Sequence, residues 1–394
     1  MNMLNNSSKP VILFDYQQKA LSECNKGDFL HSYILAKELT KYFTLYGLKP
    51  YSNPEIISKE TNVFFVKNKY FKFAQSVLNP LCQSIGIILK KIKFDLIYSR
   101  YNSLLIGQIG LILSILSKKP LIIEIGGVPW EEVKGLRSLR FFRKLYLLPL
   151  KFSKTNIFYS KEIRDEILKY IKIDVDKNVI IPCGVDDSKA VIKDKNSIRL
   201  KYGIDSDINI FSFCGSIDKW QGLDIALEAC KNLNDSGYKD YIFIIVGGGG
   251  YLDMIRALAC KLGVIDNIVF TGKISNAGAL DYINLSDFCL APFKSYRKTS
   301  PLKIFEYGAC GKITLSSDIP DVRALDLDEN LIYFTSDSSA SLFDKLKEIL
   351  TMKNKDSRYD PHKIRERVIA KYSWKVIIKK IIEEVINPFF SERR

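Results

Sequence analysis

The chain has 394 residues, of which 47% are hydrophobic and 26% charged, so it is globular rather than disordered and long enough for two domains. No apolar run reaches the roughly 18–20 residues that cross a bilayer, and the first residues lack the pattern of a secretory signal. The net charge of +15 favours contact with a polyanion such as a phosphorylated substrate, an anionic lipid or nucleic acid, without choosing among them.

Short apolar runs alternate with helical patterns along the chain. In the first half, strands are expected at 11–16, 62–66, 94–99, 120–126, 155–160 and 178–182. In the second half, strands are expected at 208–215, 241–248, 267–272, 287–293, 313–317 and 330–334. Helical periodicity lies between them, as in 223–233 and 251–263. Strands buried on both faces read as continuous apolar runs, so this alternation predicts doubly wound parallel sheets in an α/β fold.

A polar and highly charged stretch at 186–201 separates the two series of strands and has the composition of a linker. We therefore expect an N-terminal, acceptor-binding domain over 1–190 and a C-terminal, donor-binding domain over 191–372. A final helix over 373–394 is expected to pack back towards the N-terminal domain. Open parallel sheets bind ligands beyond the carboxyl ends of their strands, so the site is expected between two facing domains.

The eight cysteines form no C-x-x-C pair, and the chain has only two histidines. Several of the cysteines lie inside apolar runs, which is typical of small buried hydrophobic residues in a reducing compartment. A zinc site is not expected. The glycines of "VGGGG" (246–250) lack the Lys-Ser/Thr of a phosphate loop, so a tight strand-to-helix turn is the favoured interpretation.

The most informative stretch is "SPLKIFEYGACGK", residues 300–312. Ser300 is a plausible N-cap and Pro301 suits the first helical position. The start of such a helix binds phosphate readily, and Lys303 adds a positive charge in the same turn. Glu306 could accept hydrogen bonds from the paired hydroxyls of a ribose. Phosphate and ribose together indicate a nucleoside diphosphate; a capped helix with a solvated glutamate is the alternative.

Residues 300–323, "SPLKIFEYGACGKITLSSDIPDVR", resemble the donor-site motif of retaining GT-B glycosyltransferases of family 4, the glycosyl transferases group 1, which reads S-P-L-K-x-F-E-Y-M-A-x-G-K. The segments 213–229, 241–275 and 280–293 resemble the units that precede this motif. In the first half, "VIIPCGVDDSKA" and "IIEIGGVPWEE" resemble further family segments. The resemblance covers most of 94–380 and is strongest in the second half.

The resemblance implies a GT-B fold of two facing Rossmann-like domains with a C-terminal helix crossing back, and a hexosyltransferase-type enzyme without metal or other cofactor. Glu306 would then hold the nucleotide ribose. The donor phosphates and base would be lined by Gly215, Ser216, Lys219, Lys273, Ile274, Ser300, Pro301, Leu302 and Lys303. Where the family usually has two basic residues, this chain has Ser216 and Gln221, so Lys219 and Lys303 are the expected replacements.

Three residues of the first half are candidates for catalysis. Glu124 lies at the carboxyl end of a predicted strand, where it could act on substrate or cap a loop. Asp28 lies in "NKGDF" (25–29), where the family has a glycine-rich loop near the acceptor. His31 follows it by three residues and could equally be structural.

The segment 137–154 carries six basic residues and no acid, interleaved with aromatic and leucine residues. It is typical of a helix on an anionic membrane surface, which 70–93 could extend, or of a helix packed on a sheet with a solvated basic face. No nucleic-acid recognition module accompanies the charge, so nucleic acid is not an expected partner.

The sequence therefore predicts transfer of a sugar, with retention, from a nucleotide-diphosphate sugar, with a UDP-sugar as the expected donor. The expected acceptor is a lipid-linked or polysaccharide acceptor. The expected location is cytoplasmic, with peripheral contact at the inner membrane face. By family analogy, the pathway would be bacterial capsule or O-antigen synthesis. A non-catalytic GT-B-like subunit of a polysaccharide assembly complex, a nucleotide-sugar epimerase and a phosphorylase are the alternatives.

Overall fold

The computed structural model describes residues 9–15, 34–48, 64–66, 93–101, 106–128, 130, 140–204, 208–296, 298, 300–351 and 359–391. The chain divides into two compact units. The first unit comprises Met1–Cys183 together with Ile377–Arg394, and the second comprises Gly184–Val376. Each unit is described separately below.

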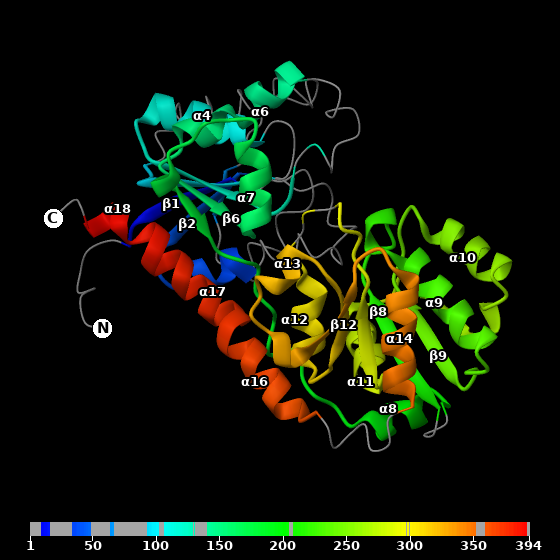
Figure 1. The fold of residues 1–394 in the computed structure, drawn as a ribbon. Helices are drawn as coiled ribbons and strands as arrows, with labels where there is room; N and C mark the ends of the chain where they lie inside the picture. Colours follow the sequence, from blue (N-terminus) through cyan, green and yellow to red (C-terminus); the bar gives the residue numbers. More distant parts are fainter. Residues whose placement is uncertain are drawn as a thin grey trace. The chain divides into compact units, whose positions relative to one another are not determined.

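Each unit is built on one parallel β-sheet with helices on its faces (Figure 1). In the described part of the first unit, seven strands lie in the order β3-β2-β1-β4-β5-β6-β7. Their bounds are β1 Val11–Asp15, β2 Thr44–Leu48, β3 Phe64–Val66, β4 Leu96–Tyr101, β5 Leu121–Ile125, β6 Thr155–Phe158 and β7 Asn178–Ile180. The main helices of this unit are α4 (Ile106–Ser117), α6 (Arg140–Phe152) and α7 (Lys161–Leu168).

In the second unit, six described strands lie in the order β10-β9-β8-β11-β12-β13. Their bounds are β8 Asn209–Cys214, β9 Tyr241–Val246, β10 Ile268–Gly272, β11 Phe288–Ala291, β12 Thr314–Asp318 and β13 Leu331–Thr335. The main helices are α8 (Lys195–Lys201), α9 (Leu223–Asp235), α10 (Leu252–Lys261), α11 (Asn276–Leu285), α12 (Leu302–Ala309), α13 (Pro320–Arg323), α14 (Ser339–Leu350) and α16 (Pro361–Tyr372). The predicted α/β fold with doubly wound parallel sheets is confirmed.

The strand β2 was not predicted. Its burial explains why: Leu45 is fully buried, whereas Thr44 and Tyr46 are only half-buried, and Gly47 interrupts the apolar residues. A strand of this kind does not give the continuous apolar run by which the other strands were recognised.

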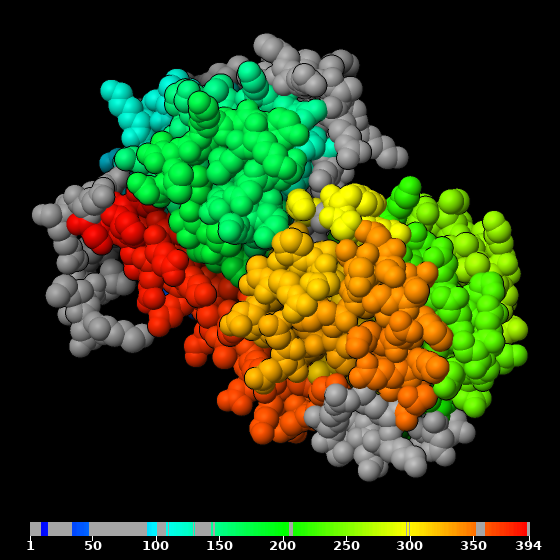
Figure 2. Space-filling model, in the orientation of Figure 1, coloured from blue at the N-terminus to red at the C-terminus, as the bar shows by residue number. Residues whose placement is uncertain are grey.

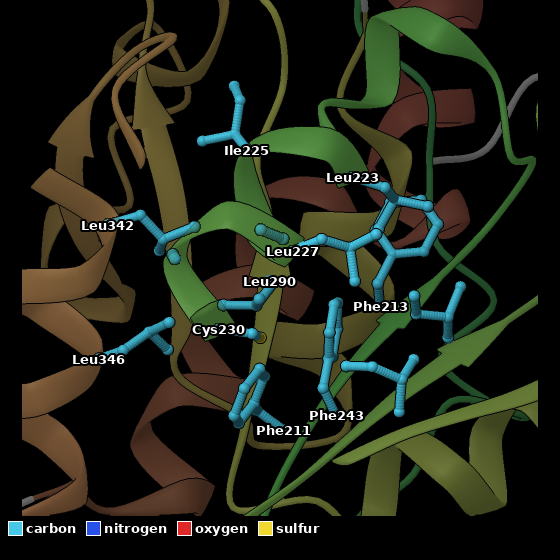
Figure 3. Close-up of a cluster of buried hydrophobic side chains, with 14 of the residues drawn as sticks. Phe211, Phe213, Leu223, Ile225, Leu227, Cys230, Phe243, Leu290, Leu342 and Leu346 are labelled. Atoms are coloured by element: carbon cyan, nitrogen blue, oxygen red, sulfur yellow. The ribbon is translucent and has the colours of Figure 1, made fainter. Parts of the chain in front are cut away.

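One face of the second sheet is covered by α9, α10 and α14, which enclose the main hydrophobic core (Figure 3). Phe211, Phe213 and Phe243 supply the strand side of this core, and Leu227 and Leu342 supply part of the helix side. The space-filling view shows α14, in orange, on the surface beside the green segment that contains α9 (Figure 2). The full burial of these side chains is the main source of stability for this unit.

The two ends of the second unit are joined by backbone hydrogen bonds. The amide of Val185 donates to the carbonyl of Tyr372 at 2.8 Å, and the amide of Trp374 donates to the carbonyl of Val185 at 3.1 Å. The C-terminal segment then continues as α17 (Trp374–Lys380), a π-helical turn (Ile381–Ile386) and α18 (Pro388–Ser391). Over the described ranges, no helix is both long enough and apolar enough to span a bilayer.

Candidate functional site

The strand order of the second sheet reverses between β8 and β11, which are hydrogen-bonded neighbours. In doubly wound sheets, ligands bind beyond the carboxyl ends of the strands at this reversal. The segments that leave these ends are 215–222 after β8 and, after β11, the one that begins with 292–296. The candidate site is therefore this edge of the second sheet.

The loop after β8 is packed tightly on the glycine loop after β9. A Cβ on Gly247 would lie 1.9 Å from the carbonyl oxygen of Gly215, and one on Gly249 would lie 2.3 Å from that of Ile217. The amide of Ile217 donates to the carbonyl of Gly248 at 3.1 Å. The predicted tight turn at 246–250 thus serves a second purpose, because only glycine lets the two loops approach this closely.

Helix α12 begins one residue later than its sequence predicts. Pro301, rather than Ser300, is the N-cap, and the first helical residue is Leu302. The reason is a tight turn at Pro301 (φ −82°, ψ 62°), closed by the Leu302 amide donating to the Ser300 carbonyl at 2.9 Å. The amide of Leu302, a residue that was predicted to line the donor site, therefore donates within this turn.

Glu306 lies on α12 and is partly exposed. Loss of solvent around the carboxyl raises the pKa of Glu306 to about 7, although the nearby Lys303 and a hydrogen bond from the Asn276 side-chain amide each lower this pKa. Asn276 is the first residue of α11, which follows Lys273 and Ile274 directly. The structure therefore brings the predicted ribose-binding carboxylate next to the start of α11, close in sequence to Lys273 and Ile274, which were predicted to line the donor site.

Lys303 lies on the same helix and is only 8% exposed. Its Nζ lies 3.6 Å from the centre of the Phe213 ring and 5.2 Å from that of the Phe293 ring, and it donates a hydrogen bond to Oε1 of Gln221. A Cβ on Gly215 would lie 3.4 Å from Nζ of Lys303, so the side chain ends beneath the loop after β8. Burial holds the pKa of Lys303 well below its usual value.

The other predicted donor-site residues surround this pair. Gly215, Ser216 and Lys219 are exposed in the loop after β8, and Lys219 begins a short 3₁₀ turn that ends at Gln221. Lys273 is exposed beside the glycine loop, where a Cβ on Gly248 would lie 3.6 Å from its own Cβ. Pro301 is buried, and Ile274, Ser300 and Leu302 are half-buried.

In the first unit, Glu124 on β5 is fully buried. Its carboxylate accepts a hydrogen bond from the Tyr98 hydroxyl at 2.6 Å and a second from the Tyr159 hydroxyl. Nε of Arg100, itself buried, lies 4.0 Å from the carboxylate. This network ties Glu124 on β5 to Tyr98 on β4 and to Tyr159, the residue after β6. Asp28 and His31 lie outside the described residues.

Two contributions to the site were missed by sequence reasoning. Asn276 was overlooked because an amide at the start of a helix is a common capping residue without a chemical signature. Gln221 was interpreted only as a missing cation, whereas the structure shows it as the hydrogen-bond acceptor of Lys303. The position of Lys303 between Leu302 and Ile304 in the apolar start of α12 was the available signal for a buried cation.

Comparison with known structures identifies the class of fold. Sucrose-phosphate synthase from Thermosynechococcus elongatus superposes with a TM-score of 0.78 at 16% identity, over 98% of this chain and 100% of that chain. Anabaena HepE in complex with UDP superposes with a TM-score of 0.77 at 14% identity, over 96% of this chain and all of that chain. The fold of this chain is therefore GT-B, as predicted.

Residues 194–366, which lie within the second unit, match the family model of the glycosyl transferases group 1. The chain is also similar to an uncharacterised glycosyltransferase of Methanocaldococcus jannaschii, with 24% identity over 318 residues, which is 76% of this chain and 77% of that protein. The predicted family is thus supported where the donor-site motif lies.

Proposed function

We propose that the protein is a retaining, family 4 hexosyltransferase that uses a nucleotide-diphosphate sugar, with a UDP-sugar as the first donor to test. The observation that carries the proposal is the meeting of Glu306, Lys303 and the glycine-supported loop after β8 at the reversal point of the second sheet. A carboxylate suits ribose hydroxyls, and a cation near backbone loops suits a diphosphate.

In the proposed reaction, the bond between sugar and diphosphate breaks through an oxocarbenium-like state, and negative charge develops on the leaving diphosphate. Lys303, with the more exposed Lys219, supplies positive charge on this side, and Glu306 fixes the nucleoside. Stabilising the leaving group in this way requires prearranged charges and dipoles rather than a covalent role for the protein. The UDP complex of the HepE structure supports the choice of UDP as first ligand.

The proposal is tested by a thermal-shift panel with UDP, GDP, ADP and CDP, run on the wild type and on Glu306→Ala. Binding to the native state raises the melting temperature by mass action. We expect one nucleotide to raise it in the wild type and not in the variant. A response of the variant equal to that of the wild type would remove Glu306 from the site.

A non-catalytic GT-B-like subunit is the second candidate, and the neutral residues Ser216 and Gln221 favour it. The absence of a thermal shift with all four nucleotides would support this candidate. Nucleotide binding followed by sugar transfer to an added acceptor would exclude it. The anomeric configuration of the product, measured by NMR, tests retention, and turnover of the donor without an acceptor would indicate an epimerase.

We also propose a lipid-linked or polysaccharide acceptor in bacterial capsule or O-antigen synthesis, reached by peripheral contact of 137–154 with the inner membrane face. The described part of this segment exposes Lys144, Lys151 and Lys154, and Phe152 has 57% of its surface exposed. Sedimentation with phosphatidylglycerol vesicles should fall for Phe152→Glu and not for the control Leu200→Glu, which changes an exposed leucine of the second unit. Equal sedimentation of both variants and the wild type would contradict this part of the proposal.

A further inference from the structure

Lys303 is a buried amino group without a counter-charge in direct contact. Among the residues that the structure describes, no carboxylate oxygen lies within 4.0 Å of its Nζ, and its contacts are two aromatic rings and the amide oxygen of Gln221. A buried charge that is not paired costs several kcal/mol, and proteins commonly avoid this cost by keeping such a group neutral. Lysine can respond in this way, whereas arginine stays charged.

Three titratable groups lie around Lys303: the thiol of Cys214 at the end of β8 and the carboxylates of Asp218 in the following loop and Glu306 on α12. The two carboxylates favour the charged form of the lysine. Burial outweighs them, so the pKa of Lys303 stays well below its usual value. Burial also raises the pKa of the Cys214 thiol well above its usual value, so this thiol is neutral and adds no negative charge near Lys303.

We propose that Lys303 is uncharged in the empty site and takes up one proton from the solvent when a nucleoside diphosphate binds, so that the cation for the diphosphate is created by binding. The inference rests on the proposed function. The proton moves from water or buffer to the lone pair of Nζ, and no covalent bond of the ligand changes. Gln221 accepts a hydrogen bond from the amine in both states and keeps it beneath Gly215.

This arrangement explains the neutral residue at position 221. A fixed cation there would face the Lys303 nitrogen at hydrogen-bond distance, and two like charges so close together would exclude each other. Because Gln221 has a neutral amide, the empty site contains no permanent positive charge at this position. The negative charge of the diphosphate then favours protonation of Lys303, because an opposite charge nearby stabilises the charged form. Nucleotide affinity and proton affinity therefore increase together.

The experiment is isothermal titration calorimetry at pH 8.5 with UDP, followed by GDP and ADP, in buffers that differ in ionisation heat. At this pH the Glu306 carboxyl, with a pKa of about 7, is already ionised, and so is the terminal phosphate of the free nucleotide. The dependence of the observed heat on the buffer then reports proton uptake by the protein. We expect a clear net uptake in the wild type and none in Lys303→Arg and Lys303→Met.

Lys261→Arg, which changes an exposed lysine at the end of α10, is the matched control and should take up protons like the wild type. Wild-type affinity should fall by up to about tenfold per pH unit above pH 8, while the affinity of Lys303→Arg should stay constant. If a nucleotide binds without proton uptake, or if Lys303→Met retains the uptake, the inference is wrong and the proposed function stands. If no nucleotide binds, the proposed function itself fails, and the inference fails with it.

Discussion

Replacing Glu306 by glutamine should change nucleotide binding and stability in opposite directions. In the free protein the carboxyl has a pKa of about 7 instead of 4.5, so its charge is disfavoured by the fold. The difference between these values corresponds to at most ~3.4 kcal/mol, and because the side chain is partly exposed we expect about 1–3 kcal/mol. The amide avoids this cost.

The sign of the pH dependence follows from the raised pKa. The contribution of Glu306 to stability is fully present below pH 4.5 and is lost as the pH rises through about 7. Glu306→Gln should therefore be more stable than the wild type at pH 8, and equally stable near pH 4.5. Urea unfolding at the two pH values measures this difference.

Glu306→Gln should weaken nucleotide binding at pH 8, the same pH at which it stabilises the fold. At pH 8 the variant loses a charged acceptor for the ribose hydroxyls, which is worth ~1.5–3 kcal/mol, or about 10- to 150-fold in Kd. At pH 5.5 the wild-type carboxyl is protonated, so the ratio of the two Kd values should shrink to a few-fold. Calorimetry at both pH values, with Glu228→Gln as an exposed control on α9, gives the ratio. A ratio that does not change with pH would refute the reasoning.

Three further predictions concern the second unit. Gly247→Ala should weaken nucleotide binding by more than about tenfold, because its Cβ would meet the Gly215 carbonyl. The control Gly237→Ala, also at a positive φ (86°) but with no atom within 4 Å, should cost ~1 kcal/mol of stability and leave binding unchanged; equal Kd values for the two variants would contradict this. Asp287→Ala should lower the free energy of unfolding by ~3 kcal/mol, because Asp287 accepts hydrogen bonds from the Ile210 amide at 2.7 Å and the buried Arg199 guanidinium at 2.9 Å. The control Glu348→Ala removes one partner of an exposed ion pair and should lower it by less than ~1 kcal/mol. Similar losses for the two variants in urea unfolding would refute the assignment. Transfer activity should stay within about twofold after EDTA treatment, since the proposed chemistry uses protein charges for the leaving diphosphate; a loss restored by Mg²⁺ would show the opposite.

The Asp287 group also carries a pH dependence. Burial by itself would raise the pKa of Asp287, but the Ile210 amide and the Arg199 and Lys195 cations together hold it below its usual value. Its contribution to stability is therefore present above pH 3.8 and is lost as the pH falls below that value. In Asp287→Ala this acid-side loss should disappear, which urea unfolding between pH 3 and pH 5 can measure.

Most of the strands could be predicted from the sequence, because a strand buried on both faces leaves a continuous apolar run, as in β5 and β9. The strand β2 could not be predicted, because its half-buried residues resemble those of a loop. The donor motif predicted roles for Glu306 and Lys303, and these roles stay predictions. It could not reveal their neighbours, since Gln221 lies 82 residues from Lys303 and contacts it only in the folded chain. The N-cap was assigned to Ser300 from residue preference, and the tight turn at Pro301 overrode that preference.

The division of the chain has a consequence for its synthesis. The second unit is one continuous segment whose first and last residues are tied by the Val185 hydrogen bonds, so it can close as soon as Trp374 has been made. The first unit begins earlier but includes residues from Ile377 onwards, so it cannot be completed until those residues have been made. The unit whose synthesis starts first is therefore completed second, and a truncation at Ile377 would remove part of the first unit while leaving the second unit whole.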